Sequence, residues 1–338
     1  MKAADLSNGR KPDLAGAIED TLRRNLDRHL PDHTGNPLID VAGYVLGSRG
    51  KMLRGLTLLE ACRAVGGDSE AILQAAAGTE YGHLASLIHD DLMDRDELRR
   101  GRPSVWRRYG TDLALLGGDL FIFHAYHSLA LCRHVVPAER VAQVLEVLSS
   151  SCIDLCLGQA LESRLTANQG VAEEQYLQMI RHKTASLFRA SAESGAILGG
   201  GTPEQVLAVR DYGEDLGMAF QMVDDLLSYT QDDVRLRKPA HSDLKNRRMT
   251  LPIIYALETG SEADRRVLQE VFGAEAAFDD VAVVYEEVVG ILRRSGALER
   301  VAGEARTFQR RSLSRLFVLP PNAGRDSLEA VAEFVIAS

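Results

Sequence analysis

The sequence predicts an all-α fold, built as a single large helical bundle. Apolar residues recur at helical rather than strand spacing in almost every segment, and several segments are apolar nearly all round, as the central helices of a bundle must be. The chain has no internal repeat, low-complexity tract or long linker that would separate domains. We therefore expect one domain over residues 1–338, with a flexible polar lead-in at residues 1–11.

The predicted helices follow one another at short intervals. The first long helix covers residues 69–95 with a broad apolar surface, and Gly101-Arg102-Pro103 follows its end. A second covers 112–134, and Pro137 suits the first turn of a third that extends to about residue 165. The polar segment 230–246 is predicted to be a long loop, of the kind that often acts as a lid or binding loop. Further helices are expected at residues 172–198, 203–229, 247–258, 262–272, 279–317 and 324–337.

Charge and cysteine content narrow the class of protein. The formal net charge of -9 argues against nucleic acid as the main partner, although local basic clusters can still bind a small polyanion. No stretch of about 18 uncharged apolar residues occurs, so no transmembrane segment is predicted, and the N-terminus lacks the apolar core of a secretory signal. The cysteines lack metal-finger spacing and are expected to be buried, reduced thiols in a cytoplasmic protein. They are Cys62, Cys132, Cys152 and Cys156.

An acidic cluster, Asp90-Asp91-Leu92-Met93-Asp94, directly follows an apolar run. At helical geometry Asp90 and Asp94 project from one face about one turn apart, where like charges repel. Carboxylates in a partly buried setting need compensation by cations. The alternative is the solvated acidic end of a helix, which needs no bound cation.

A second acidic pair, Asp224-Asp225, lies inside an otherwise apolar helix from Leu216 to Leu227. Two such pairs on different helices of one bundle are hard to explain without a shared cation. Carboxylate oxygens suit Mg²⁺, which usually keeps several waters while bridging carboxylates and a phosphate. The lack of His or Cys ligands disfavours zinc, and the lack of Glu-x-x-His pairs disfavours a di-iron site. The sequence therefore favours magnesium.

Basic residues alternate with the two acidic pairs along the chain. Guanidinium and ammonium groups are the usual partners of phosphate oxygens, so this alternation indicates a site for a metal-bridged diphosphate. For each residue taken alone, a solvated surface charge is the simpler interpretation. The Gly50-Lys51 element is not a Walker A loop, because Val45 stands where that loop needs glycine. The basic residues are Lys51, Arg54, Arg99, Arg100, Lys183 (beside Thr184), Lys238, Lys245, Arg247 and Arg248.

Taken together, these motifs resemble those of the trans-isoprenyl diphosphate synthases (polyprenyl synthetases). The resemblance covers about residues 45–256, and it is specific because the motifs recur in the family's order. The first aspartate-rich motif matches Leu87 through Asp94 with Leu98 through Pro103, the second matches Phe220 through Asp225, and other signatures match Lys183-Thr184, Ser242-Asp243-Leu244 and Thr250-Leu251-Pro252.

The resemblance implies an isoprenoid-synthase-like bundle with a central substrate cavity, and it assigns roles to individual residues. Asp90, Asp94 and Asp224 would hold Mg²⁺ against an allylic diphosphate. The catalytic group would also include Asp91, Asp225, Lys183 and Lys238. The allylic substrate would contact Arg99, Thr184, Gln221 and Arg248, and isopentenyl diphosphate would contact Lys51, Arg54, His83 and Arg100. His83 alone could equally be a structural histidine, although it lies two turns before Asp90 on the same helix face.

Three departures from the family pattern stand out. Ser228 replaces the usual last aspartate of the second motif, which puts the strength of one magnesium site in question. Arg248 stands where lysine is usual and keeps the charge. The segment Gly50-Lys51-Met52-Leu53-Arg54-Gly55 keeps two cations of the usual motif and loses one arginine and the proline.

Product length is expected to depend on the helix face before the first motif. In the family, a bulky aromatic residue five positions before the motif accompanies short products, and here the small Ala85 occupies that position. Chains longer than fifteen carbons are therefore expected, with Tyr81, a turn deeper, as the floor. The alternative is that both side chains simply pack against a neighbouring helix.

The chemistry implied is head-to-tail chain elongation, with geranylgeranyl diphosphate or a longer chain as product. The allylic carbon–oxygen bond ionises, and the double bond of isopentenyl diphosphate attacks the cation. The departing diphosphate is a plausible acceptor for the final proton, since no dedicated base stands out. Two alternatives stay open: a terpene cyclase, which would not need Lys51, Arg54 and Arg100 for a second diphosphate, and a weakly active partner subunit of a heteromeric synthase. Homodimerisation is an expectation from the family.

Overall fold

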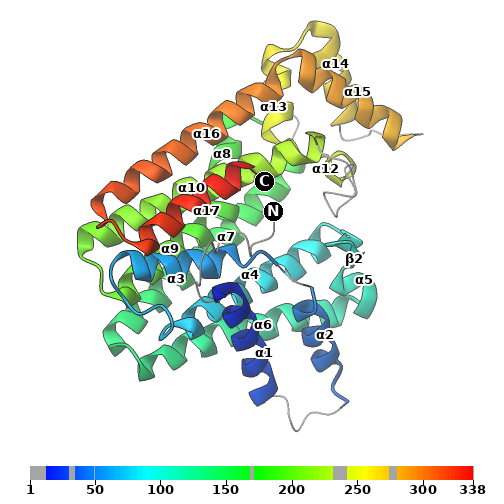
Figure 1. The fold of residues 1–338 in the computed structure, drawn as a ribbon. Coiled ribbons are helices and arrows are strands. Elements are labelled where there is room, and N and C mark those ends of the chain that lie inside the picture. The colour runs from blue at the N-terminus through cyan, green and yellow to red at the C-terminus, as the bar shows by residue number, and fades with distance from the viewer. Residues whose placement is uncertain are drawn as a thin grey trace. The chain divides into compact units, whose positions relative to one another are not determined.

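The computed structural model describes residues 13–29, 35–48, 50–167, 171–230, 242–273 and 280–337. Helices dominate these residues, so the predicted all-α fold is confirmed (Figure 1). The described strands are the two-residue β1 (Leu98–Arg99) and β2 (Arg102–Pro103), which pair antiparallel with Leu98 opposite Pro103. The lead-in expected to be flexible, residues 1–11, lies outside the described residues.

The helices are given in chain order. They are α1 (Leu14–His29), α2 (Pro37–Leu46), α3 (Leu53–Ala64), α4 (Leu73–Met93), α5 (Val105–Tyr109), α6 (Thr111–Leu131), η2 (Cys132–His134), α7 (Ala138–Ala167), α8 (Glu173–Ile180), η3 (Arg181–Ala185), α9 (Ser186–Gly199), α10 (Pro203–Thr230), α12 (Ser242–Lys245), α13 (Leu251–Thr259), α14 (Glu262–Val271), α15 (Val281–Arg294), α16 (Ala297–Arg315), η4 (Leu316–Val318) and α17 (Ala323–Ala337).

Contacts divide the chain into two compact units. The first unit comprises residues 1–151, 187–213 and 313–332, and the second comprises residues 152–186, 214–312 and 333–338. Each unit is therefore assembled from segments that are far apart in the sequence. The expectation that the whole chain forms one domain stays a prediction.

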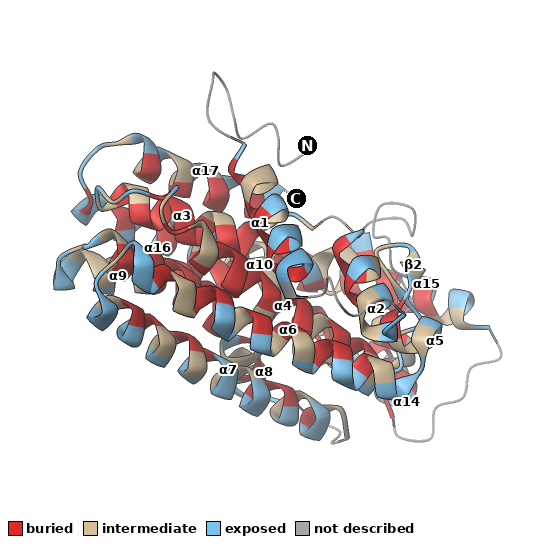
Figure 2. Cartoon of the chain, turned by 90° about the horizontal axis from the view of Figure 1, so that it is seen from below, coloured by how far each residue is buried: buried red, intermediate tan, exposed pale blue. Residues whose placement is uncertain are grey.

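The first unit is organised around α4, which packs against α1, α3 and α6. Gly78 permits the close approach of α4 to α6, because a Cβ there would lie 2.9 Å from the carbonyl oxygen of Ala125. Helix α3 is buried along almost its whole length, including Leu58 and Leu59, and Figure 2 shows it mostly in the colour of buried residues. Its apolar residues therefore surround the helix instead of forming one stripe, as expected of a central helix.

The second unit has its own packed core. Helix α13 packs against α8, α14 and α15, and its residues Leu251 to Ala256 are all buried. The buried Tyr255 donates a hydrogen bond to Glu173 over 3.0 Å, and the guanidinium of Arg300 lies 3.5 Å from the centre of its ring. These contacts join α13 and α16 to the first residue of α8.

Two predicted helices are interrupted. The helix expected at 279–317 is two helices, α15 and α16, because Gly296 adopts a positive φ of 73° between them. The helix expected at 172–198 contains η3, a π-helical turn, at Arg181–Ala185. Helices α1, α2 and α5 were not predicted at all, and α12 lies within the segment 230–246 that was expected to be a loop. The start of α2 carries an ordinary signal, Asn36 as N-cap before Pro37.

Two expectations from composition need comment. Cys62 and Cys132 are buried free thiols, but Cys152 and Cys156 on α7 are exposed, so their predicted burial was wrong.

Two helical segments, Thr111–His134 and Ala138–Thr166, are long and apolar enough to cross a membrane by length and composition alone. Core helices of soluble proteins also meet that criterion, so the expected absence of a transmembrane segment stays a prediction.

Candidate functional site

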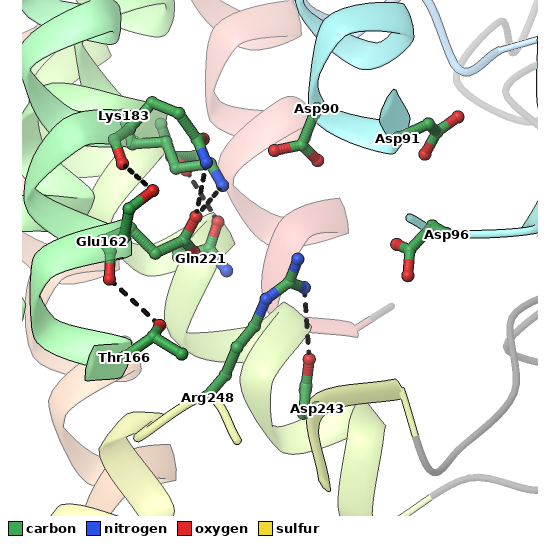
Figure 3. A network of polar contacts seen from close by, with 12 residues as sticks. Asp90, Asp91, Asp96, Glu162, Thr166, Lys183, Gln221, Asp243 and Arg248 are labelled. Atoms are coloured by element: carbon green, nitrogen blue, oxygen red, sulfur yellow. Dashed lines mark hydrogen bonds and ion pairs between the residues drawn. The ribbon is translucent and has the colours of Figure 1, made fainter. Parts of the chain in front are cut away.

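The first acidic cluster lies at the C-terminal end of α4. Asp90 and Asp91 are in its last turn, and Asp94 caps it, with its backbone N–H donating to the carbonyl oxygen of Asp90 over 2.9 Å. The carboxyl end of a helix carries partial negative charge, so three carboxylates there are electrostatically unfavourable without a cation. Asp90 and Asp91 point away from one another (Figure 3). The cluster is thus divided between an outer carboxylate and a buried one.

Arg99 on β1 provides one of the cations. Its Nε donates to Asp91 over 2.8 Å, and Nη2 also bonds the same carboxylate oxygen. Nη2 lies 3.6 Å from Asp90 and 3.9 Å from Asp96. Burial alone would lower the pKa of Arg99, but the hydrogen bond to Asp91 and the three nearby carboxylates raise it. Arg99 is therefore a permanent cation that holds the end of α4 to the β1–β2 hairpin.

Three residues predicted to hold isopentenyl diphosphate come together in the first unit. Arg54 Nη1 lies 3.2 Å from His83 Nε2, and the Arg54 guanidinium stacks 4.4 Å from the centre of the Phe188 ring. Arg100, in a left-handed conformation with φ 54°, donates to the carbonyl oxygen of Ser48 over 2.7 Å. A Cβ on Gly50 would lie 2.9 Å from this guanidinium, so a larger residue there would displace the end of the Arg100 side chain. The exposed Lys51 follows directly.

The charges in this basic cluster affect one another. Burial, and then Arg54, Arg100 and Arg99, lower the pKa of His83 well below its ordinary value. His83 is therefore neutral near pH 7. Its Nε2 must accept from Arg54, because an arginine has no acceptor. Burial also lowers the pKa of Arg54 to about 10, against the opposing charge of Glu80, and its Nε finds no partner among the described residues. Such a site favours an incoming anion.

In the second unit, η3 presents Lys183 and Thr184 beside α7. The two segments approach closely at Gly158, where a Cβ would lie 2.4 Å from the backbone nitrogen of Lys183. The Lys183 ammonium bonds the carboxylate of Glu162 (Figure 3). Gln159 also donates to this carboxylate over 3.1 Å. π-Helical turns are rare and occur frequently at functional sites. The sequence does not indicate this turn.

The two aspartates of the second acidic pair, on α10, differ in burial, as Asp90 and Asp91 do. Asp224 is exposed, whereas Asp225 is buried. Asp225 accepts a hydrogen bond from the Tyr176 hydroxyl and a second, of 2.9 Å, from Gln221 Nε2. Thr184 donates to Gln221 Oε1 over 2.7 Å. Burial raises the pKa of Asp225 to about 8, although both hydrogen bonds oppose the shift.

The structure describes some of the remaining residues that were predicted to contact the allylic diphosphate. Arg248 Nη1 lies 3.5 Å from Asp243, which is in α12 and belongs to the signature Ser242-Asp243-Leu244 (Figure 3). Arg247 beside it has a positive φ of 51°. Ser228 accepts a hydrogen bond of 2.7 Å from Tyr285 through its carbonyl oxygen, and the effect of its side chain on a magnesium site stays a prediction. Lys238 lies outside the described residues.

The predicted chain-length residues are packed in the core of the first unit. The Tyr81 hydroxyl donates to the carbonyl oxygen of Leu22 on α1, and its ring centre lies 5.6 Å from that of Phe121 and 5.2 Å from that of His124. Ala85 is 2% exposed. Tyr81 is therefore rigidly held, which suits a floor and suits ordinary packing equally well.

Each unit thus brings together one subset of the predicted residues. The first contains the Asp90 cluster and the basic cluster, and the second contains Lys183, Thr184, Gln221 and Asp225. Sequence reasoning missed two partners in the second unit, Glu162 and Tyr176. Glu162 stands between Leu161 and Ser163 in α7 and carried no local signal. A single tyrosine in α8 gave none.

A family model described as polyprenyl synthetase matches residues 36–289, which is most of the chain. The chain belongs to the polyprenyl synthetase family. The resemblance inferred from the motifs is therefore confirmed. A "short chain isoprenyl diphosphate synthase" of Methanothermobacter thermautotrophicus is 38% identical over 96% of this chain and 97% of its own.

Solved structures agree with this membership of the polyprenyl synthetase family. A geranylgeranyl pyrophosphate synthetase from Pyrococcus horikoshii has a TM-score of 0.86 and 32% identity, over 96% of this chain and 98% of that one. A geranylgeranyl pyrophosphate synthase from Corynebacterium glutamicum, complexed with isoprenyl diphosphate and magnesium, has a TM-score of 0.87 and 25% identity, over 96% and 98%.

Proposed function

We propose that this chain is a magnesium-dependent trans-prenyltransferase, which condenses an allylic diphosphate with isopentenyl diphosphate to give geranylgeranyl diphosphate or a longer product. The observation that carries the proposal is the basic cluster around His83 in the first unit, beside an intact first aspartate motif. A terpene cyclase binds one diphosphate and has no use for a second cationic site. The name and the product of the P. horikoshii relative support the same chemistry.

The acidic clusters suit Mg²⁺. Their donors are carboxylate oxygens, and the carboxylates at the end of α4 need a cation to offset the helix dipole. We assign Asp90, Asp94 and Asp224 as the ligands. When bound, magnesium would act as a Lewis acid that stabilises charge on the leaving diphosphate. The bound magnesium of the C. glutamicum relative supports this assignment.

The chain's own residues bind and orient the substrates. Lys183, Thr184, Gln221, Lys238 and Arg248 hold the allylic diphosphate and stabilise its charge as the carbon–oxygen bond breaks. Arg99 contributes its fixed positive charge to the same group. Lys51, Arg54 and Arg100 hold isopentenyl diphosphate, with neutral His83 aligning Arg54. The apolar residues of α4 exclude water from the allylic cation.

Asp91 and Asp225 take a different role from that first expected of them. Both are buried, and both accept hydrogen bonds from neighbouring side chains: Arg99 on the first, Tyr176 and Gln221 on the second. We assign them as residues that position their partners and do not touch substrate.

The test is incubation of the purified protein with isopentenyl diphosphate, geranyl diphosphate and Mg²⁺, followed by chromatography of the products. We expect products of twenty carbons or more, and complete loss of condensation in excess EDTA that added Mg²⁺ restores. Cyclised hydrocarbon would indicate a terpene cyclase. Condensation that appears only after a second protein is added would indicate a partner subunit, and turnover in metal-free EDTA would exclude the magnesium mechanism.

Product length gives a separate prediction. If Ala85 lines the growing chain, Ala85→Phe should truncate products towards fifteen or twenty carbons, because the ring fills space that the tail needs only after the first additions. Overpacking should also cost about 1–3 kcal/mol of stability. Ala256→Phe on α13 is the matched control, since this alanine is equally buried and α13 carries no assigned site residue. An unchanged product spectrum in Ala85→Phe would show that position 85 does not control product length.

The proposed enzyme is a cytoplasmic homodimer. Helix α6 supports association, because it exposes large apolar side chains at Leu115, Leu116, Phe123 and Tyr126, with Phe123 70% exposed. Contiguous exposed apolar side chains commonly mark association surfaces. Light scattering of the purified protein measures the mass directly, and a monomer at assay concentration would contradict this assignment.

A further inference from the structure

A chain of four polar side chains runs through the second unit from α8 to η3. The Tyr176 hydroxyl donates to Asp225 Oδ2, Gln221 Nε2 donates to Asp225 Oδ1, and Thr184 Oγ1 donates to Gln221 Oε1. Tyr176 is 2% exposed and Asp225 is 4% exposed. This series of hydrogen-bonded side chains thus begins in the core of the unit and ends at the π-helical turn.

The directions of these hydrogen bonds follow from the chemistry of the carboxylate. Each oxygen of the Asp225 carboxyl group accepts a hydrogen bond, one from Tyr176 and one from Gln221, so Gln221 turns its NH₂ group towards Asp225. The amide oxygen then lies on the opposite side, where it accepts the single proton of the Thr184 hydroxyl. One N–H of Gln221 and the lone pairs of Thr184 remain for other partners.

The orientation of this amide matters beside a polyanion. An N–H attracts a diphosphate oxygen, whereas a carbonyl oxygen in the same place repels it. A glutamine side chain can exchange the two ends by a half turn, at little intrinsic cost. Asp225 removes this freedom, and Tyr176 holds the second oxygen of Asp225 so that the carboxylate itself cannot rotate.

We propose that Tyr176 and Asp225 are positioning residues, which fix the amide of Gln221 and, through it, Thr184 for the allylic diphosphate. This inference rests on the proposed function, because it assumes that Gln221 meets that substrate. Neither Tyr176 nor Asp225 touches the substrate. Asp224, one residue earlier on α10, is the exposed member of the pair.

The test compares Tyr176→Phe, Gln221→Ala and the double variant with the parent, using geranyl diphosphate, isopentenyl diphosphate and Mg²⁺. Tyr176→Phe should raise KM for geranyl diphosphate about ten-fold, the loss of one hydrogen bond to a charged group, while KM for isopentenyl diphosphate stays the same. If Tyr176 acts through Gln221, it should have no further effect in the Gln221→Ala background. Asp225→Asn should raise the same KM, because an asparagine can donate and so permits the amide to turn.

Tyr255→Phe is the matched control. Its hydroxyl also donates to a carboxylate, that of Glu173 at 3.0 Å, and its ring is fully buried in the same unit. It should match Tyr176→Phe in loss of melting temperature without any change in either KM. Additive effects of Tyr176→Phe and Gln221→Ala, or equal effects of the two Tyr→Phe variants on KM, would overturn the inference.

The same experiment separates the inference from the proposed function. If the parent fails to condense the two diphosphates, the proposed function is wrong. Calorimetric titration of geranyl diphosphate with Mg²⁺ into the same variants then still measures whether Tyr176 acts through Gln221. If the parent is active but Tyr176→Phe binds geranyl diphosphate as tightly as the parent, the positioning role is wrong and the function stands.

Discussion

Asp90→Ala is expected to lower turnover by about a thousand-fold, the scale on which a single group that stabilises transition-state charge contributes. Its folded stability in metal-free buffer should hold or rise. Asp90 lies in the last turn of α4, where removing one of three carboxylates relieves repulsion among them and with the helix dipole. Arg99 keeps its bonds to Asp91.

Asp91→Ala provides the contrast. This carboxylate is buried and accepts two hydrogen bonds from Arg99, so its loss leaves a guanidinium with weaker contacts at 3.6 and 3.9 Å. We expect the free energy of unfolding to fall by about 3 kcal/mol. Denaturant melts and initial rates for both variants measure the difference. A stability loss in Asp90→Ala as large as that in Asp91→Ala would point to a structural role for Asp90.

Gly158→Ala is expected to lower turnover by about a hundred-fold, because displacement of a catalytic group by about 1 Å can cost that much. The added methyl group would lie 2.4 Å from the backbone nitrogen of Lys183 and 2.7 Å from its Cα, and backbone atoms cannot move aside as a flexible side chain can. The π-helical turn must therefore shift, together with Lys183 and Thr184. Overpacking should cost about 1–3 kcal/mol of stability as well.

Gly303→Ala is the control for this substitution. Gly303 lies in α16 with nothing within 4 Å of its added Cβ, so alanine there should stabilise the helix by about 0.5–1 kcal/mol and leave turnover unchanged. Initial rates and thermal melts of the two variants decide the matter. Parental turnover in Gly158→Ala would show that the turn does not depend on the close approach of α7.

The sequence predicted the fold and the charged clusters because both leave local signals. Helical periodicity is read within a few turns, and Asp90-Asp91 or Asp224-Asp225 inside apolar runs stand out without any knowledge of the fold. The break between α15 and α16 was less visible, since Gly296 is one of many glycines and only its backbone conformation distinguishes it.

What the sequence did not reveal depends on contacts between distant segments. Adjacent aspartates look equivalent in a motif, yet Asp91 and Asp225 are buried, whereas Asp90 is partly exposed and Asp224 is exposed. Arg99 hydrogen-bonds Asp91 and lies farther, at 3.6 Å, from Asp90, and Tyr176 hydrogen-bonds Asp225. Glu162 beside Lys183 is likewise separated from it by 21 residues, and no local pattern predicts that pairing.

The π-helical turn at Arg181–Ala185 also makes this stretch of the chain intolerant of changes in length. Each residue of a helix advances the side-chain direction by about 100°, so deletion of His182 would narrow the turn and rotate Thr184 away from Gln221 relative to α8. Substitutions within the turn preserve the directions in which the following side chains point, whereas single-residue insertions and deletions change them. Chimaeras made by recombination between relatives should therefore have their crossover points outside residues 173–185.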